Sequence, residues 1–180
     1  MMSNVAKRDG NERPMRTSAQ MIPLGNELAM PWDLTEWFDP AALRQWITDE
    51  IESLDWANPE LIEYLRSNPA YHPKMLLCLL SYAYATGAYD SEEIVRRCEK
   101  DVPFREICGS HAPASGHALS RFRRENRGLL KWCLVQLFKH AIKARLYESH
   151  LPAGLKRRLL DVAVTRLDLA RQMDRGAEGL

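Results

Sequence analysis

No apolar run in this 180-residue chain reaches the ~18 residues that a membrane-spanning helix needs, so no membrane span is expected. The N-terminus also lacks an apolar core, which argues against a secretory signal. Cysteine is scarce, with four residues and no paired short spacing. The sequence therefore predicts reduced thiols in a cytoplasmic protein. Strand patterns are missing too, because almost every patterned segment has a helical period.

Cys98, Cys108, His111 and His117 are residue types that could together bind zinc. Their spacing matches no common structural zinc pattern, and the other two cysteines, Cys78 and Cys133, sit within apolar helical stretches. The sequence also shows no nucleophile–base pair or metal cluster with usable spacing. We therefore expect no metal, no cofactor and no enzymatic activity.

The composition, with 46% hydrophobic and 27% charged residues, is that of a globular protein, and the period predicts an all-α helical bundle. Residues 1–30 show no period and are expected to be flexible, apart from a short segment that docks on the fold. Residues 31–150 form the predicted helical domain. Residues 151–175 form a C-terminal amphipathic helix.

Proline and capping residues mark the helix boundaries. Asp39-Pro40 and Asn58-Pro59 each start a helix, and Asn68-Pro69 ends the second one. His72-Pro73 starts the most apolar helix, which is expected at the centre of the bundle. Asp90 and Glu93 have the spacing of a capping box for the helix that follows them.

A short turn that starts at Pro103 and closes at Gly109 precedes the last long helix of the domain. Ser115 is the expected N-cap of that helix, and Gly128 marks a bend or break within it. Pro152 opens the C-terminal helix, in which Arg166 interrupts an apolar stripe of Leu155, Leu159, Val162, Leu169 and Met173. The stripe fits either dimerisation or packing onto the same chain, of which the second is the commoner outcome.

Charge is distributed unevenly, although the net charge is only +1. Residues 36–63 carry eight acidic residues and one basic residue, whereas residues 115–158 carry eleven basic residues against Glu125 and Glu148. Such an asymmetry steers a polyanion to one end of a molecule. The alternative is a pair of solvated helix faces that neutralise each other across the fold.

The basic helix after Ser115 supplies the residue types that contact DNA. Leu119, Phe122 and Leu130 are expected to face the core. The side chains expected to point away from it are His117, Ser120, Arg121, Arg124 and Lys131. Arginine binds a guanine edge with two parallel hydrogen bonds, and both Arg and Lys neutralise phosphates. With the preceding turn, this helix predicts a helix-turn-helix. The predicted DNA-binding residues are His117, Ser120, Arg121, Arg123, Arg124, Arg127 and Lys131, and Lys139 and Lys143 add phosphate contacts if the helix runs beside the duplex.

The motif order resembles the N-terminal DNA-binding domain of InsH-like bacterial insertion-sequence DDE transposases over roughly residues 38–147. The matching segments are YHPKMLLCLLSYAYATG, SEEIVRRCEKDVPFREICG and LSRFRREN. The family usually has Thr where this chain has Ala118, and an Asp-containing cap in the turn that here carries His111 and Gly116. Base readout at the helix start is therefore expected to differ.

In that family a catalytic domain follows, opening with an Asp-Gly-Thr strand. Here Asp161 and Asp168 lie in a helical pattern, whereas two-metal chemistry needs several converging carboxylates. The resemblance implies a cytoplasmic, nucleoid-associated DNA-binding protein without a nuclease, which binds double-stranded DNA at an element end or an operator, as a homodimer if two half-sites are read. The alternative is a protein-interaction or dimerisation module that binds no DNA.

Overall fold

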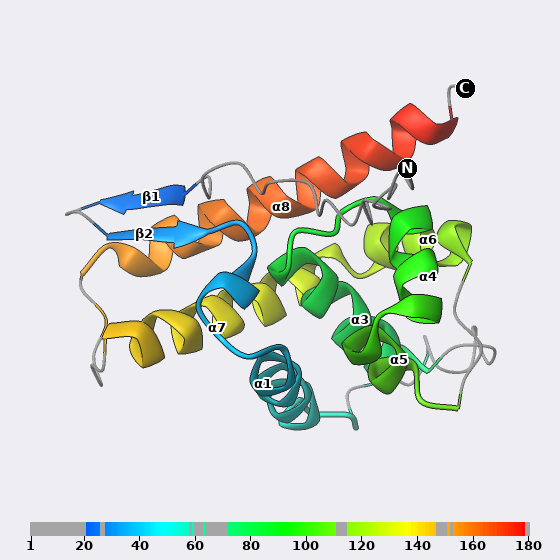
Figure 1. Ribbon diagram of the computed structural model, residues 1–180, viewed down its shortest axis with the longest axis horizontal. Helices are drawn as coiled ribbons and strands as arrows, with labels where there is room; N and C mark the ends of the chain where they lie inside the picture. Colours follow the sequence, from blue (N-terminus) through cyan, green and yellow to red (C-terminus); the bar gives the residue numbers. More distant parts are fainter. Residues whose placement is uncertain are drawn as a thin grey trace, which may run out of the picture.

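The computed structural model describes residues 21–25, 28–57, 59, 63, 72–110, 115–146, 151 and 153–178. These residues form a helical bundle with one small β-hairpin at its edge (Figure 1). The all-α prediction is confirmed except for this hairpin. The short helix predicted from Asn58-Pro59 lies largely outside the described residues, as do residues 1–20.

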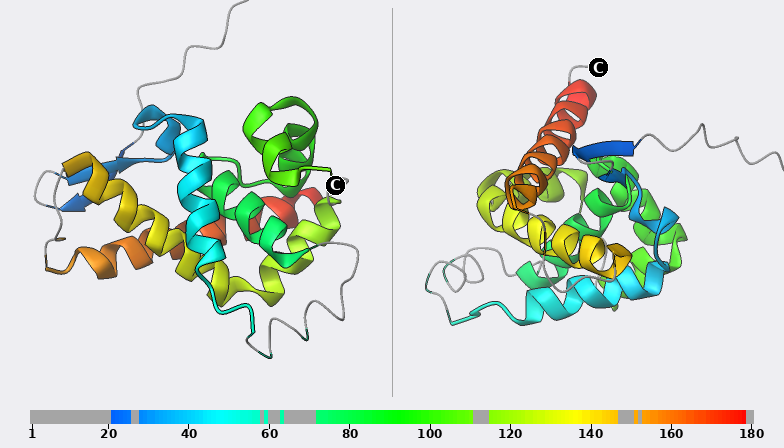
Figure 2. Two further views of the ribbon diagram at one scale, coloured as in Figure 1. Left: turned by 90° about the horizontal axis from the view of Figure 1, so that it is seen from below. Right: turned by 90° about the vertical axis from the view of Figure 1, so that its left-hand side faces the viewer.

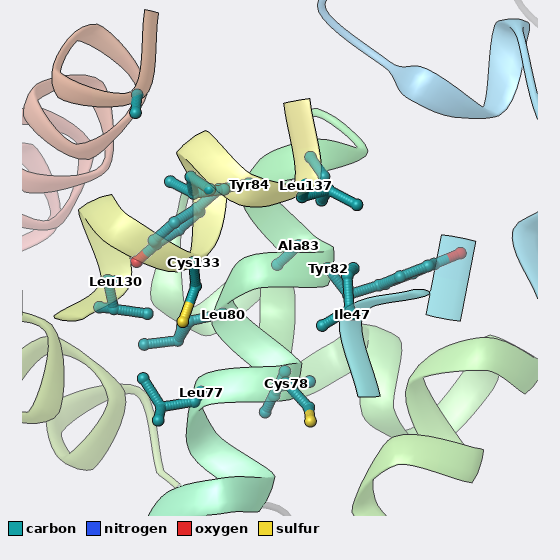
Figure 3. Packing of buried hydrophobic residues seen from close by; sticks show 14 of the residues in the cluster. Ile47, Leu77, Cys78, Leu80, Tyr82, Ala83, Tyr84, Leu130, Cys133 and Leu137 are labelled. Atoms are coloured by element: carbon teal, nitrogen blue, oxygen red, sulfur yellow. The ribbon is translucent and has the colours of Figure 1, made fainter. Parts of the chain in front are cut away.

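The central helix is α3, Pro73–Ala85, which is buried at all but one of its thirteen positions. His72 caps it by accepting a hydrogen bond from the backbone N–H of Lys74, as the sequence predicts for this boundary. Figure 3 shows Leu77, Leu80 and Tyr84 packed against side chains of the neighbouring helices. A helix that is apolar on every side is stable only when other elements cover it completely.

Two long helices flank α3. The first, α1 (Pro40–Glu52), is capped by Asp39 and buries Leu43, Ile47 and Ile51. The second, α7 (Arg127–Leu146), packs against α3, against α1 and, most extensively, against α8 (Leu155–Glu178). Figure 1 and Figure 2 show α7 and α8 running side by side along the length of the molecule. Among the described residues, no helix is long and apolar enough to cross a membrane.

The prediction that the chain contains no strand is wrong. Strands β1 (Met21–Gly25) and β2 (Leu28–Pro31) pair antiparallel, with Ile22 opposite Met30. The hairpin packs on α8, where Arg158 donates a hydrogen bond to the carbonyl of Leu24. Its strands are too short and too rich in proline to show a period of two, and their stability comes from the buried side chains of Leu24 and Met30.

Helix α8 buries its apolar stripe within its own chain. Leu155, Leu159 and Val162 are buried against the bundle, whereas Met173 is 45% exposed. Arg166, which interrupts the stripe, is fully buried and donates to the carbonyls of Tyr84 and Pro31. Of the two outcomes considered for this stripe, the structure shows packing onto the same chain.

Candidate nucleic-acid interface

Three short helices form a compact unit beside α3. They are α4 (Ser91–Lys100), α5 (Val102–Cys108) and α6 (Gly116–Glu125), and α4 packs against both of the others. Gly109 ends α5 with a φ of 59°, in the left-handed region that favours glycine, as its position in the sequence predicts. Residues 111–114 of the connection lie outside the described part of the chain, so the helix-turn-helix stays a prediction.

Helix α6 is defined by polar caps at both ends. The Ser115 side chain accepts a hydrogen bond from the backbone N–H of Ala118 at 3.2 Å, which confirms the predicted N-cap. At the other end Asn126 leaves the helical conformation, and its side chain donates to the carbonyl of Phe122 at 3.1 Å. The break between α6 and α7 therefore falls at Asn126, two residues before the glycine that the sequence suggested.

The structure buries two of the seven predicted DNA-binding side chains. Ser120 is 7% exposed and Arg123 is 3% exposed, so neither can reach a ligand on the surface. Arg123 forms a buried ion pair with Asp174 of α8 and donates to the hydroxyls of Tyr84 and Ser120, both at 3.3 Å. The expectation that Ser120 points outward is wrong, and the DNA contact predicted for Arg123 does not fit its burial, because α3 and α4 pack against this side of α6 and Asp174 of α8 supplies the counter-charge.

Asp174 is the residue of this region that the sequence analysis missed. Its carboxylate accepts hydrogen bonds from both the backbone N–H and the hydroxyl of Ser91, at 3.1 and 2.9 Å. It therefore binds the N-terminus of α4 and the Arg123 guanidinium of α6 at once, which stabilises their relative positions. A signal was available, since Arg123 follows the core residue Leu119 by four and precedes Leu130 by seven, which places it on the apolar stripe.

The other α6 residues of the set lie on one exposed side. His117, Arg121 and Arg124 follow each other at steps of four and three, and all three are exposed. Arg121 also pairs with Glu125 at 2.8 Å, an exposed contact within the same helix. This row of side chains is called the α6 face below.

Arg127 and Lys131 continue the basic surface on the first turns of α7. Arg127 is half-buried and forms an ion pair with Asp168 of α8 at 2.9 Å. Lys131, one turn further along α7, is also half-buried. The ion pairs of these arginines therefore lie within α6, through Glu125, or join α6 and α7 to α8, through Asp174 and Asp168.

A small acidic cavity of about 240 Å³ lies beside the start of α6. Asp90, Glu92 and Asp174 line it together with His117. These carboxylates lower the local potential, so a phosphate is better placed near Arg121 and Arg124 than near His117. The geometry therefore favours the second half of α6 for contact with a polyanion.

The cysteines show the pattern expected of reduced thiols. All four are buried and none forms a disulfide, and burial raises the pKa of Cys78 to about 11 and that of Cys133 to about 12. Cys98 and Cys108 share a hydrogen bond between α4 and α5, which raises the pKa of Cys98. Within the described residues no group of His, Cys, Asp or Glu side chains is arranged to hold a metal ion, and His111 lies outside them.

Comparison with known families gives a match over the segment that contains α6. Residues 40–125 match the transposase domain DUF772. This part of the chain is transposase-related. The matched segment begins at α1 and ends with α6, so it contains the α6 face but not α7 or α8. No curated protein and no solved structure matches the chain.

Proposed function

We propose that the chain binds a specific duplex DNA site, such as an element end or an operator, through the α6 face. The observation that carries the proposal is the row of His117, Arg121 and Arg124 on one exposed side of a helix whose opposite side is fixed in the core. The transposase-related character of residues 40–125 supports it, as does the resemblance to InsH-like N-terminal domains.

Each exposed side chain has a distinct role in this proposal. Arg124 and Arg121 present the planar guanidinium that recognises guanine through two parallel hydrogen bonds. His117 lies nearer the N-terminus of α6, beside the carboxylates of Asp90 and Glu92, and its role is contact with a base edge rather than with a phosphate. Arg127 and Lys131 contribute charge toward the phosphate backbone, which fixes register without reading sequence.

Ser120 and Arg123 support the interface without touching DNA. Both lie in the hydrogen-bonded cluster with Tyr84 and Asp174 beneath α6. A recognition helix has to hold its side chains in fixed directions to discriminate between base pairs, and buried polar contacts provide that rigidity. The proposal assigns the chain no catalytic step, because Asp161 and Asp168 lie on helix α8 and Asp168 is already paired with Arg127.

The experiment that tests this function is selection of bound duplexes from a random pool by the purified chain. We expect enrichment of a defined sequence within a few rounds, and Arg124→Gln should relax the preference at a single position of that sequence, by about 1–3 kcal/mol. Lys100→Gln, on the exposed side of α4, is the control and should leave the selected sequence unchanged. A pool that stays random through every round would contradict the proposal.

A further inference from the structure

Helix α7 is unusual for an exposed helix of twenty residues because it contains no acidic side chain. Its charged residues are Arg127, Lys131, Lys139, Lys143 and Arg145. Helices on protein surfaces usually mix both signs of charge, which gives pairs within the helix and keeps the local potential low. Within α7 no acidic side chain offsets this positive charge, and Asp168 of α8 pairs with Arg127 at its first turn.

The burial pattern of α7 leaves one row of side chains facing outward along most of the helix. Gly128, Trp132, Gln136, Lys139 and Lys143 recur at steps of three and four, and each is exposed or half-buried. The buried residues Leu130, Leu134 and Phe138 lie on other sides of the helix, toward the core. Trp132, at the middle of the row, is 39% exposed, which is uncommon for a tryptophan that serves only the core.

Helix α8 adds charge at the far end of the row. It begins beside the C-terminal end of α7, where Lys156 and Arg157 are both exposed (Figure 1). Its acidic residues lie elsewhere along the helix: Asp174 is buried and Asp168 is paired with Arg127. Asp161 lines a cavity beside the β-hairpin and is the acidic group nearest this end of α8 in the sequence.

The dimensions of the row match those of duplex DNA. The row runs from Gly128 to Lys143, fifteen residues apart, which at 1.5 Å per residue is about 22 Å along α7. The same length along the axis of a duplex covers roughly seven base pairs, at a rise of about 3.4 Å per base pair. In Figure 1 helix α7 starts next to α6 and ends at the opposite end of the molecule.

From these observations we propose that the outward row of α7, together with Lys156 and Arg157 of α8, is a second DNA-contacting surface. It follows the phosphate backbone from the α6 face across roughly seven further base pairs. Lys139, Lys143 and Arg157 neutralise phosphates at the far end. Trp132 lies between the two ends, where its indole N–H is a donor for a phosphate or sugar oxygen. This inference rests on the proposed function and extends it beyond the transposase-related segment.

The test compares two duplexes that share one sequence, one of about 10 and one of about 24 base pairs, titrated with the full chain at several salt concentrations. The test variant is Lys139→Gln, Lys143→Gln and Arg157→Gln. Its matched control preserves charge, as Lys139→Arg, Lys143→Arg and Arg157→Lys. A second variant changes only the exposed Lys143 and Arg157 to Gln. It tests the same surface if the change at the half-buried Lys139 prevents the triple variant from folding.

We expect wild type and the charge-preserving control to bind the longer duplex at least tenfold more tightly. The neutral triple variant should lose that preference, and its slope of log affinity against log salt should fall by about 2–3 on the longer duplex. If both neutral variants keep the wild-type preference for the longer duplex and the wild-type salt slope, the proposal of a second DNA-contacting surface is wrong.

A separate variant, Arg121→Gln with Arg124→Gln, distinguishes the two proposals. If it loses binding to both duplexes while the neutral α7–α8 variants bind like wild type, the proposed function stands and this extension fails. If wild type itself shows no salt-dependent binding to either duplex, both fail.

Discussion

Arg123 and Asp174 show at the residue scale how a basic helix can carry a charge that never meets solvent. Both side chains are more than nine-tenths buried, and the pair joins α6 to α8. A buried ion pair adds little compared with well-packed apolar residues, but removing one partner leaves an uncompensated charge in the core. The pair therefore makes the position of α6 depend on α8.

We predict that Asp174→Ala lowers the free energy of unfolding by about 3–5 kcal/mol, because Arg123 is left buried and unpaired. Changing both residues to methionine should cost much less than the single change. The control is Glu125→Ala, which removes only the exposed partner of Arg121 and should cost less than about 1 kcal/mol. Urea unfolding of the three variants measures this, and equal losses for Asp174→Ala and Glu125→Ala would refute the assignment.

Tyr84 gives a prediction about pH. Burial raises the pKa of Tyr84 from 10.0 to about 12, so the folded state holds the hydroxyl protonated where the unfolded chain releases the proton. Its contribution to stability is complete below pH 10 and is lost as the pH rises toward about 12. Tyr84→Phe should therefore show a shallower fall of stability over this range, by up to about 2.7 kcal/mol.

The measurement is thermal unfolding of wild type and Tyr84→Phe between pH 9 and pH 12. Cys78 and Cys133, with pKa values of about 11 and about 12, titrate in the same range, but they are present in both proteins and so do not contribute to the difference between them. Parallel pH profiles for wild type and Tyr84→Phe would show that Tyr84 does not titrate in this way.

At the scale of single elements, the end of α5 depends on one glycine. Gly109 has φ 59° and ψ −130°, a conformation that side chains with a Cβ rarely adopt. We predict that Gly109→Ala lowers the free energy of unfolding by about 1–3 kcal/mol. Gly128→Ala is the control, since Gly128 is helical with no atom close to an added Cβ, and it should be neutral or stabilising by up to about 1 kcal/mol. A neutral Gly109→Ala would contradict the strain argument.

Helix α8 gives the second prediction at this scale, through two adjacent leucines. Leu159 is fully buried and Leu160 is 39% exposed. If the apolar stripe of α8 packs within one chain, Leu159→Ala should cost about 2–5 kcal/mol at any protein concentration. Leu160→Ala should cost less than about 0.5 kcal/mol. A loss at Leu159 that disappears when the chain is concentrated would point to packing between two chains instead.

Helix boundaries were the part of the fold that sequence patterns could predict. The caps at Asp39, His72, Asp90 and Ser115 are local, since each side chain bonds a backbone N–H two or three residues on. The hairpin and the Arg123–Asp174 pair were out of reach for the opposite reason. Both depend on contacts with the distant helix α8, since the hairpin packs on it through Leu24 and Arg158, and Asp174 lies 51 residues from Arg123.

The same distinction explains the candidate site. Steps of three and four place His117, Arg121 and Arg124 on one side of α6 from the sequence alone. The neighbouring side, with Ser120 and Arg123, is buried because α3 and α4 pack against it and Asp174 of α8 meets it. Periodicity predicts which residues share a face, but not which faces another helix covers.

At the scale of the whole molecule, positive charge on α6, α7 and the start of α8 lies along one length of the bundle. The acidic residues of α1, such as Asp39, Asp49 and Glu52, lie on a separate helix and are exposed. The ion pair observed between α1 and another helix joins Arg44 to Glu106 of α5 at 3.0 Å. This arrangement is that of a molecule that orients itself toward a polyanion before contact.

The most direct test of the account is fluorescence anisotropy of a labelled random-sequence duplex, titrated with wild type and with the Arg121→Gln, Arg124→Gln variant at low and at physiological salt. We predict that wild-type affinity falls steeply with salt, and that the slope of log affinity against log salt shrinks by about 2 in the variant. Circular dichroism should show the same helix content in both proteins. Identical affinities and slopes for the two proteins would contradict the claim that the α6 face binds DNA.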